Sequence, residues 1–178
     1  MRSAPLVSPD AAPSDAVVTL QGAGFGYGDG AVLSDVDLSI RKGEIVAIVG
    51  PNGSGKSTLM KGVLGLNERV AGTVTLFGTD STEFHDRARL GYVPQRHTLS
   101  AAVRATAEEI VATGRLPRIG WLGRLRATDR QIVARSLDVV GLADRAATEV
   151  STLSGGQQRR VLIARALAGQ AEGLLMDE

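Results

Sequence analysis

The chain has 178 residues, a formal net charge of +1, and 43% hydrophobic and 22% charged residues. This length is enough for one domain with a sizeable core, and the composition is ordinary for a globular protein. The balanced charge gives no overall electrostatic argument for a nucleic-acid partner. The absence of cysteine excludes disulfides, thiol catalysis and cysteine-ligated zinc. Because His85 and His97 are the only histidines, a histidine-based metal site is not expected either.

The sequence contains no membrane span and no leader that we can recognise. No apolar run approaches the roughly 20 residues that a transmembrane helix needs, and the N-terminus lacks the apolar core of a signal peptide. We therefore expect a cytoplasmic protein, with any membrane role going through a partner. Residues 1–16 place prolines among serine, alanine and aspartate without periodicity, which predicts a disordered tail.

Two strands are predicted near the N-terminus. Residues 17–20 form a short apolar run that is typical of a strand. Glycines alternate with other residues over 22–30, and because no helix follows, a flexible turn between edge strands explains them better than a nucleotide-binding G-x-G motif. Apolar and polar residues then alternate over 32–40, as in a half-buried antiparallel strand.

The most informative stretch is 45–58, which reads IVAIVGPNGSGKST. Residues 45–49 resemble a strand that is buried on both faces. The next residues match G-x-x-x-x-G-K-[ST], the phosphate-binding loop, and a helical run follows at once. The glycines let successive backbone N–H groups point at a phosphate chain, and the helix N-terminus adds unpaired N–H groups and partial positive charge.

This loop is expected to hold phosphates and magnesium. Lys56 is placed to reach the terminal phosphates, and the Ser57 hydroxyl to ligate Mg²⁺. The alternative, an ordinary glycine-rich turn, is disfavoured because the loop lies between a predicted strand and a predicted helix. The predicted nucleotide-binding residues of the loop are Gly50, Pro51, Asn52, Gly53, Ser54, Gly55, Lys56, Ser57 and Thr58.

Further strands and helices follow the loop. Strands are predicted at 72–78 and at 91–93, which is closed by Pro94 and Gln95. Helices are predicted over 101–113 and from the capping box at 128–131 to about Val140, where Gly141 suits the C-terminal stop.

Between these helices, residues 115–126 are basic and include Trp121, the only tryptophan. A solvated loop explains them as well as a docking surface, for which exposed aromatic and arginine residues are typical. Both interpretations stay open.

Residues 153–157, LSGGQ, predict a second anion-binding element. Ser154 and Gln157 have capping-box spacing, so Ser154 should cap a helix from Gly155 to about Ala168. Two adjacent glycines are poor helix formers, costing roughly 1 kcal/mol each, and their use would be close approach of N–H groups to an anion. A plain helix cap is the alternative.

The sequence closes with an apolar run, 173–176, followed by Asp177 and Glu178. This pattern predicts a buried strand that delivers carboxylates at its C-terminal edge, where ligands bind in open parallel sheets. Asp177 would hold Mg²⁺, directly or through water, and Glu178 would orient or deprotonate the attacking water. An exposed acidic terminus is the alternative.

The order of these motifs over residues 17–178 resembles the nucleotide-binding subunit of ATP-binding cassette (ABC) transporters. The resemblance implies an α/β fold: a P-loop NTPase (RecA-like) core with an antiparallel β subdomain and a helical subdomain at about 96–157. It assigns adenine stacking to Tyr27, the Q-loop to Gln95, and the catalytic glutamate to Glu178. The signature residues would be Leu153, Ser154, Gly155, Gly156 and Gln157.

The same resemblance implies cofactors and partners. ATP and Mg²⁺ would be bound, with Mg²⁺ near Ser57, Gln95 and Asp177. Two subunits would form a head-to-tail homodimer, in which each signature contacts the ATP held by Lys56 of the other. A transmembrane permease and a substrate-binding lipoprotein are further expected partners, nucleic acid is not, and the subunit would lie peripherally on the inner face of the membrane.

Several short segments look like those of manganese and zinc importer ATPases: 93–96, 114–115, 120–121, Asp129 and 140–143. The ATPase does not touch the transported ion, so no residue here encodes the choice of metal.

The sequence departs from the family pattern after Glu178, where the D-loop, the switch histidine and a further core strand are expected. In the family's sheet that strand lies between the phosphate-loop strand and the strand at 173–176. Unpaired backbone groups buried at such a gap would each cost roughly 1–3 kcal/mol. We therefore expect a truncated chain that folds poorly alone and hydrolyses ATP slowly or not at all.

Three functions follow from these patterns. The first is a transport ATPase for divalent metal. The second is a soluble ABC ATPase that acts on DNA or the ribosome, which the single cassette and the absence of heptads between Lys56 and Leu153 disfavour. The third is a nucleotide-binding remnant without turnover.

Overall fold

The computed structural model describes residues 15–28, 30–93, 104–120 and 123–177. The chain divides into two compact units, residues 1–87 and 88–178. Residues 1–14 of the predicted tail, together with Gln95, Trp121 and Glu178, lie outside the described residues.

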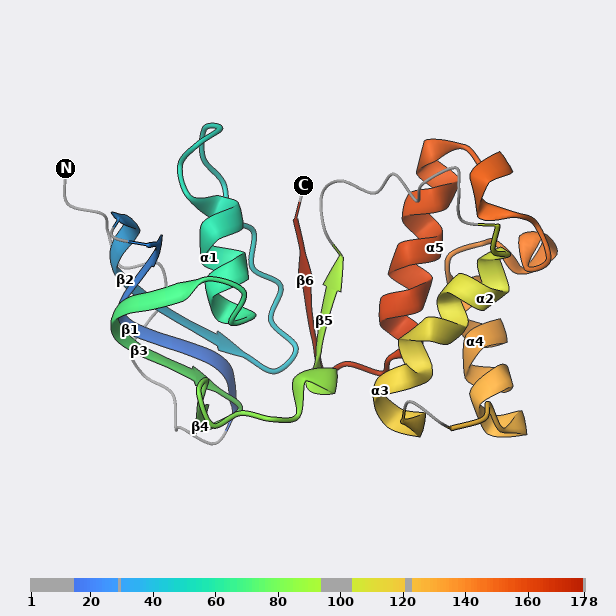
Figure 1. The fold of residues 1–178 in the computed structure, drawn as a ribbon, viewed down its shortest axis with the longest axis horizontal. Coiled ribbons are helices and arrows are strands. Elements are labelled where there is room, and N and C mark those ends of the chain that lie inside the picture. The colour runs from blue at the N-terminus through green and yellow to red at the C-terminus, as the bar shows by residue number, and fades with distance from the viewer. Residues whose placement is uncertain (1–14, 29, 94–103, 121–122, 178) are drawn as a thin grey trace. The chain divides into compact units, whose positions relative to one another are not determined.

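The first unit contains a four-stranded antiparallel sheet with the strand order β2-β1-β3-β4 and the helix α1 (Figure 1). Its elements are β1 (Ala16–Tyr27), β2 (Gly30–Arg41), α1 (Lys56–Val63), β3 (Glu68–Leu76) and β4 (Thr79–Asp80). Val18 pairs with Leu76 and Leu20 with Val74, and all four side chains are buried. Because alternate residues of a strand share a face, this register gathers one apolar face as a core.

Most of the glycine-rich stretch belongs to a strand, and the predicted turn is confined to its end, where Gly28 lies between β1 and β2. Residues 22–27 continue β1, and shifts in its pairing with both neighbours lie between Leu20 and Gly26. A Cβ on Gly26 would collide with the backbone carbonyl of Gly30 on β2. The glycines therefore serve close backbone approach at bulges inside the sheet, where the sequence pattern alone indicated a turn.

Residues 45–49 do not form the buried strand that was predicted. They carry no strand pairing, and the exposed fractions of Ile45 and Val49 are 99% and 89%. Val46 and Ile48 are also exposed, at 40% and 39%. A strand forms only with a neighbour that accepts its hydrogen bonds, and the described residues supply none for this run. Its apolar character shows that it suits burial, and no described element provides that burial.

The second unit combines a parallel strand pair with a group of helices (Figure 1). Its strands are β5 (Leu90–Val93) and β6 (Gly173–Met176), and its α-helices are α2 (Ala107–Ala112), α3 (Leu116–Ile119), α4 (Ala127–Val139) and α5 (Gly155–Ala168). Short 3₁₀ turns lie at η1 (Arg87–Arg89), which leads in from the first unit, η2 (Thr113–Arg115), η3 (Ala143–Arg145) and η4 (Val150–Thr152). Helices α2, α4 and α5 enclose an apolar core that includes Val111, Leu137 and Val161.

The predicted C-terminal strand is present as β6, with one correction. It pairs in parallel with β5, from Leu90 opposite Gly173 to Val93 opposite Met176. Its burial is incomplete, because Leu174 and Met176 are 40% and 48% exposed. The pair therefore has the direction expected of a parallel core but lacks full cover on both faces.

Helix starts agree with prediction where the capping residue was recognised. Helix α5 begins after Ser154, as predicted. The first predicted helix starts later than expected, because Thr106 and Glu109 form a capping box that begins α2; residues 101–103 of the prediction lie outside the described residues. Helix α4 begins at Ala127, so the predicted capping box at 128–131 is wrong. The box is formed by Arg126 and Asp129, and the Asp129 carboxylate accepts from the Arg126 N–H.

Among the described residues, no helix is both long enough and apolar enough to cross a membrane.

The exposed run at 45–49 gives a first testable prediction. Its backbone amides should exchange with solvent hydrogen at least about a hundredfold faster than those of Val18 and Leu20, because only the latter are held in a sheet. Hydrogen exchange followed by mass spectrometry or NMR measures both sets in one sample. Equal protection of the two sets would show that residues 45–49 pair with a strand after all.

Candidate nucleotide-binding site

The phosphate loop adopts a backbone that glycine makes possible. Gly53 and Gly55 have positive φ angles of 80° and 92°, a region that residues with a Cβ rarely adopt. Helix α1 begins directly afterwards at Lys56, with Gly55 as its N-cap and no side chain capping the end. A helix N-terminus of this kind offers backbone N–H groups and partial positive charge, to which an anion can bind.

Lys56 folds back over this loop. Its Nζ donates to the carbonyl oxygens of Gly50 and Pro51 at 2.8 and 2.7 Å. The loop thereby holds the Lys56 cation against two of its own carbonyls. A phosphate that enters the loop meets this charge and can replace the two carbonyls as its partner.

The far end of α1 is also fixed. Arg87 donates to the carbonyl oxygens of Leu64 and Ser81, at 3.3 and 2.7 Å, and its guanidinium lies 5.7 Å from the centre of the Phe84 ring. Nearer the start of the helix, the neutral Asn67 side chain donates to the carbonyl of Thr58 at 3.0 Å. Cationic donors at a helix C-terminus satisfy its free carbonyls and oppose its dipole.

Tyr27, the predicted adenine-stacking residue, lies at the end of β1 opposite Gly30. Its exposed fraction is 51%. An exposed aromatic ring is a surface of the kind on which a flat base can stack.

The LSGGQ segment in the second unit is a capped helix start with exposed glycines. The Ser154 Oγ accepts from the Gln157 N–H at 3.3 Å, and the Gln157 Oε1 accepts from the Ser154 N–H at 2.9 Å. Leu153 is buried, whereas Gly155 and Gly156 are exposed. Apart from the chain neighbours and the nearby backbone of α5, no atom of the described residues lies within 4 Å of a Cβ built on either glycine. The predicted capping box is confirmed, and the space over the glycines can admit a ligand.

Asp177 follows β6 at its C-terminal edge, as predicted. Its N–H donates to the Val93 carbonyl at 2.9 Å, and the residue is 8% exposed. Burial raises the pKa of the neighbouring Tyr92 phenol, and the negative charge of Asp177 raises it further.

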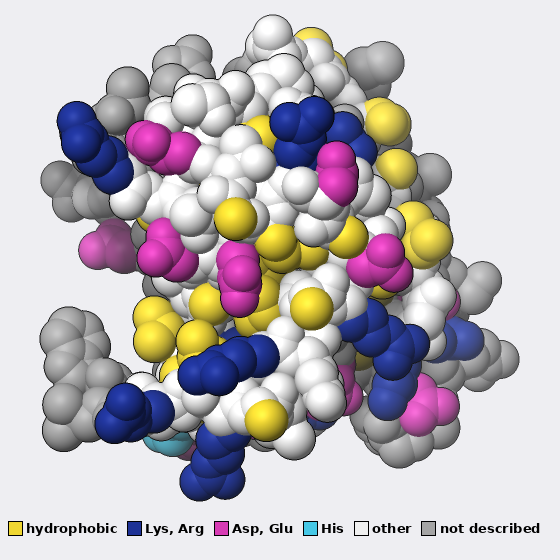
Figure 2. Space-filling model, turned by 90° about the vertical axis from the view of Figure 1, so that its right-hand side faces the viewer, with side chains coloured by type: hydrophobic (Ala, Val, Ile, Leu, Met, Phe, Trp, Pro, Cys, Tyr) yellow, Lys and Arg dark blue, Asp and Glu magenta, His cyan; other side chains and the backbone are white. Residues whose placement is uncertain are grey.

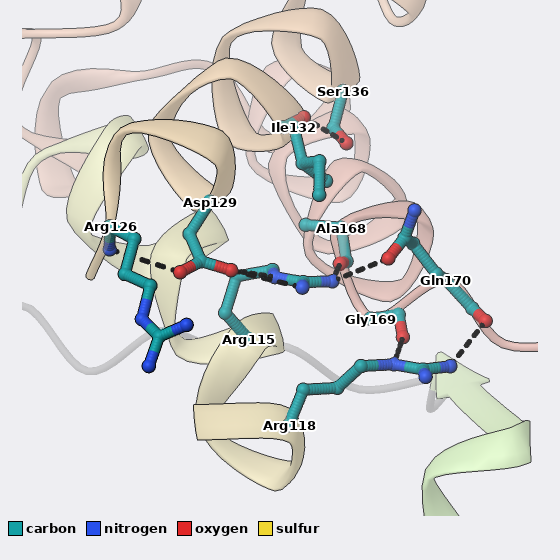
Figure 3. Close-up of polar contacts among 9 residues, drawn as sticks. All are labelled: Arg115, Arg118, Arg126, Asp129, Ile132, Ser136, Ala168, Gly169 and Gln170. Carbon is teal, nitrogen blue, oxygen red and sulfur yellow. Dashed lines mark hydrogen bonds and ion pairs between the residues drawn. The ribbon is translucent and has the colours of Figure 1, made fainter. Parts of the chain in front are cut away.

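A buried cluster of charges holds the end of α5 (Figure 3). Arg115, 6% exposed, contacts Asp129 Oδ1 at 3.0 Å and donates through Nη1 to the Ala168 carbonyl and to Gln170 Oε1, both at 2.9 Å. Arg118 donates to the carbonyls of Gly169 and Gln170 at 3.2 and 3.1 Å. Because the chain runs from here into β6, Arg115, Arg118 and Asp129 fix the segment that leads to Asp177.

This arrangement changes the interpretation of the basic segment 115–126. Arg115 is buried and points toward α5, so neither the solvated loop nor the docking surface describes it. Arg118 also donates to carbonyls at the end of α5, but its side chain is exposed. Figure 2 shows the face of the molecule that carries the helices of the second unit. Positive and negative side chains are interspersed there around hydrophobic ones. The described part of this face therefore carries no single field of positive charge.

Sequence reasoning missed the role of Arg115 and Asp129. The sequence alone indicates only that Gly114–Arg115 resembles metal-importer ATPases and that Arg115 opens a basic segment. A Cβ on Gly114 would collide with the backbone carbonyl of Arg165 on α5. The available signal is a glycine next to Arg115, followed by Asp129 on a predicted helix. Because Arg115 and Asp129 are far apart in the sequence, this signal does not reveal their contact.

The predicted site residues fall in both units. Tyr27 and residues 50–58 belong to the first unit, and residues 153–157 and Asp177 to the second. The predictions for Gln95 and Glu178 concern residues outside the described part of the chain.

Comparison with known proteins gives consistent results. A family model described as ABC transporter matches residues 33–178. The manganese transport system ATP-binding protein MntB of Bacillus subtilis is 40% identical over 161 residues, covering 90% of this chain and 64% of the relative. The zinc uptake system ATP-binding protein ZurA of Listeria innocua is 34% identical, covering 91% and 63%. The chain thus spans less than two thirds of these relatives.

Solved structures show the same fold. The structure of cbiO1 from Clostridium perfringens, part of the ABC transporter complex cbiONQ, matches with a TM-score of 0.77 and 25% identity, covering 92% of this chain and 66% of that one. An ATP binding subunit of an ABC transporter matches with a TM-score of 0.76 and 26% identity, covering 91% and 66%. The chain belongs to the ABC transporter family, and the predicted α/β P-loop fold class is confirmed.

The buried Asp129 gives a pH-dependent prediction. The N–H of Arg126 and then the guanidinium of Arg115 hold the pKa of the Asp129 carboxyl below its ordinary value. A lowered folded-state pKa means that its stabilisation is complete above the ordinary pKa of about 3.9 and is lost as pH falls through the folded-state value. Asp129→Asn should therefore lower the free energy of unfolding at pH 7, by an amount that shrinks below about pH 4.

Urea unfolding at several pH values measures this difference. Asp138→Asn, an exposed change on the same helix, is the matched control and should leave stability nearly unchanged. A difference between Asp129→Asn and the reference protein that grows as pH falls would contradict the prediction.

Proposed function

We propose that this chain is the nucleotide-binding part of an ATPase subunit that powers an ABC transporter, and that the transporter imports manganese or zinc. The observation that carries the proposal is the phosphate loop: two glycines with positive φ lead into a helix whose first residue is Lys56. The names of the relatives, which are manganese and zinc transport ATP-binding proteins, support the choice of metal.

Each predicted residue has a role in this proposal. Lys56 and the loop residues 50–58 bind the phosphates of ATP, and Tyr27 stacks on adenine. Glu178 orients or deprotonates the attacking water, as a positioned carboxylate can do. Residues 17–178 form the ATP-binding domain, with a helical subdomain at about 96–157.

Mg²⁺ is the proposed second cofactor. The hydroxyl of Ser57, the carboxylate of Asp177 and the side-chain oxygen of Gln95 are hard oxygen donors of the kind that Mg²⁺ prefers. When bound, the ion would neutralise negative charge on the phosphates of ATP. The buried position of Asp177 beside Val93 suits a ligand held by a fixed backbone.

The proposed assembly is a head-to-tail homodimer with two ATP molecules at its interface. The exposed Gly155 and Gly156, with the cap Ser154, would contact the γ-phosphate held by the other subunit's Lys56, and Leu153 and Gln157 hold this segment. A transmembrane permease and a metal-binding lipoprotein are the further partners, and nucleic acid is not one. The subunit would lie in the cytoplasm, peripherally on the inner face of the membrane.

A second candidate is a nucleotide-binding protein without turnover. The exposed and unpaired run at 45–49, directly before the loop, favours it, because a loop whose leading strand is not held in a sheet is less well positioned for catalysis. A soluble ABC ATPase remains the third reading of the motifs. A permease gene and a lipoprotein gene beside the gene for this chain would favour transport over it.

Lys56→Ala tests the proposal directly. Loss of a charged hydrogen-bond donor is worth about 1.5–3 kcal/mol, so the Kd of Mg²⁺-ATP should rise by about ten- to a hundredfold, and any hydrolysis should be lost. Titration calorimetry measures binding, and phosphate release measures hydrolysis.

Lys61→Ala is the matched control, because it removes the same charge from the last turn of the same helix. It should leave binding nearly unchanged. Binding without hydrolysis in the reference protein would select the second candidate. Equal ATP affinity of the reference protein and Lys56→Ala would refute nucleotide binding at this loop.

A further inference from the structure

A side chain of the antiparallel sheet packs directly on the phosphate loop. A Cβ built on Gly55 would lie 2.5 Å from Cδ2 of Leu33 and 2.8 Å from its Cγ. Leu33 belongs to β2 and is only partly exposed. Since Cβ atoms do not approach other carbons so closely, the contact depends on glycine at position 55. That glycine is also the N-cap of α1.

A second contact of the same kind lies further along the helix. A Cβ on Gly62 would collide with the ring of Phe25, whose exposed fraction is 0%. Gly55 and Gly62 are seven positions apart, which is about two helical turns, so they share one face. Phe25 and Leu33 are cross-strand partners on β1 and β2. The hairpin of β1 and β2 thus packs against the loop at Gly55 and against α1 at Gly62.

The same hairpin carries the residue proposed to stack on adenine. Tyr27 lies two residues after Phe25 at the end of β1. A shift in strand pairing at Phe25 marks a bulge, and bulges near functional sites redirect side chains. The residue proposed to stack on the base and the residue that packs on the phosphate loop therefore belong to the same hairpin.

We propose that Leu33 is a positioning residue for the phosphate subsite. Its side chain, packed on Gly55, fixes the height of the loop and of the first N–H groups of α1 above the sheet. The inference rests on the proposed function, since it assigns to Leu33 a part in nucleotide binding. Shortening Leu33 leaves the loop free to move, and the N–H groups and Lys56 no longer converge on the phosphates.

The test compares two probes that share only the phosphate subsite. Mg²⁺-ATP uses both subsites, whereas Mg²⁺-tripolyphosphate uses the phosphate subsite alone. Leu33→Ala should raise the Kd of both probes by a similar factor of about tenfold, since small misplacements of binding groups are costly. Tyr27→Ala should raise the Kd of ATP alone. Leu33→Met, which conserves volume, should restore both affinities.

Val74→Ala controls for a general loss of stability. Val74 is fully buried on β3, which β1 separates from β2, so it loses packing in the same unit without shortening the side chain on the loop. Its free energy of unfolding should fall, while the Kd of both probes stays unchanged under conditions in which the variant is still almost fully folded. If Leu33→Ala does not fold, Leu33→Val takes its place, because valine suits a strand and its side chain is shorter than that of leucine. It should raise both Kd values by a smaller factor.

The outcomes separate the two proposals. No binding of either probe by the reference protein refutes the proposed function. Binding by the reference protein with an unchanged tripolyphosphate Kd in the folded Leu33 variant refutes the role of Leu33 alone. If only the Kd of Mg²⁺-ATP rises in the Leu33 variant, Leu33 acts on the base and not on the phosphates. If both Kd values rise as much in Val74→Ala, the effect of the Leu33 variant is a general loss of stability. Either result overturns the inference.

Discussion

The close approach of helix α1 to the antiparallel sheet is the constraint on which the first unit depends. Gly55 and Gly62 have no side chain, and the space is taken by Leu33 and Phe25. A methyl group at either position would lift the helix from the sheet or force the neighbouring side chain aside. The position of the helix N-terminus, and with it every N–H group offered to a phosphate, follows from this packing. Glycine in the loop therefore serves two purposes: it permits the positive φ at Gly55, and it admits the sheet.

The second unit solves a comparable problem with charge. The carbonyls at the end of α5 need donors, and Arg115 and Arg118 supply them from one short segment. A buried guanidinium is tolerable only with a paired carboxylate, and Asp129 provides it while its other oxygen accepts from the Arg126 N–H. Asp129 thus has two roles. It accepts a hydrogen bond at the start of α4, and it balances the charge of Arg115, which donates to a carbonyl at the end of α5. Removing either charge would leave the other buried without its partner.

The sequence revealed those features whose physics is local. The capping box at Ser154 spans four residues, and the loop at 50–57 is a continuous motif, so each could be recognised without knowledge of the fold. The cluster of Arg115 with Asp129 and Ala168 joins three segments, and no periodicity signals such a contact. The contact of Leu33 with Gly55 was hidden for the same reason, because it is defined by the path of two separate chain segments. The capping box at Thr106 was equally local and could have been recognised.

The wrong strand at 45–49 has a different cause. Its apolar, β-branched residues were read correctly as suited to burial on both faces. Suitability is a property of the side chains, whereas a strand is a property of a pair, since each N–H and C=O needs a partner on a neighbour. β6 shows the intermediate case: it has a neighbour in β5, forms a ladder, and still leaves Leu174 and Met176 partly exposed. Pairing decides whether a run becomes a strand, and cover on its faces decides whether it is buried. An apolar pattern predicts neither unless the fold supplies the partner.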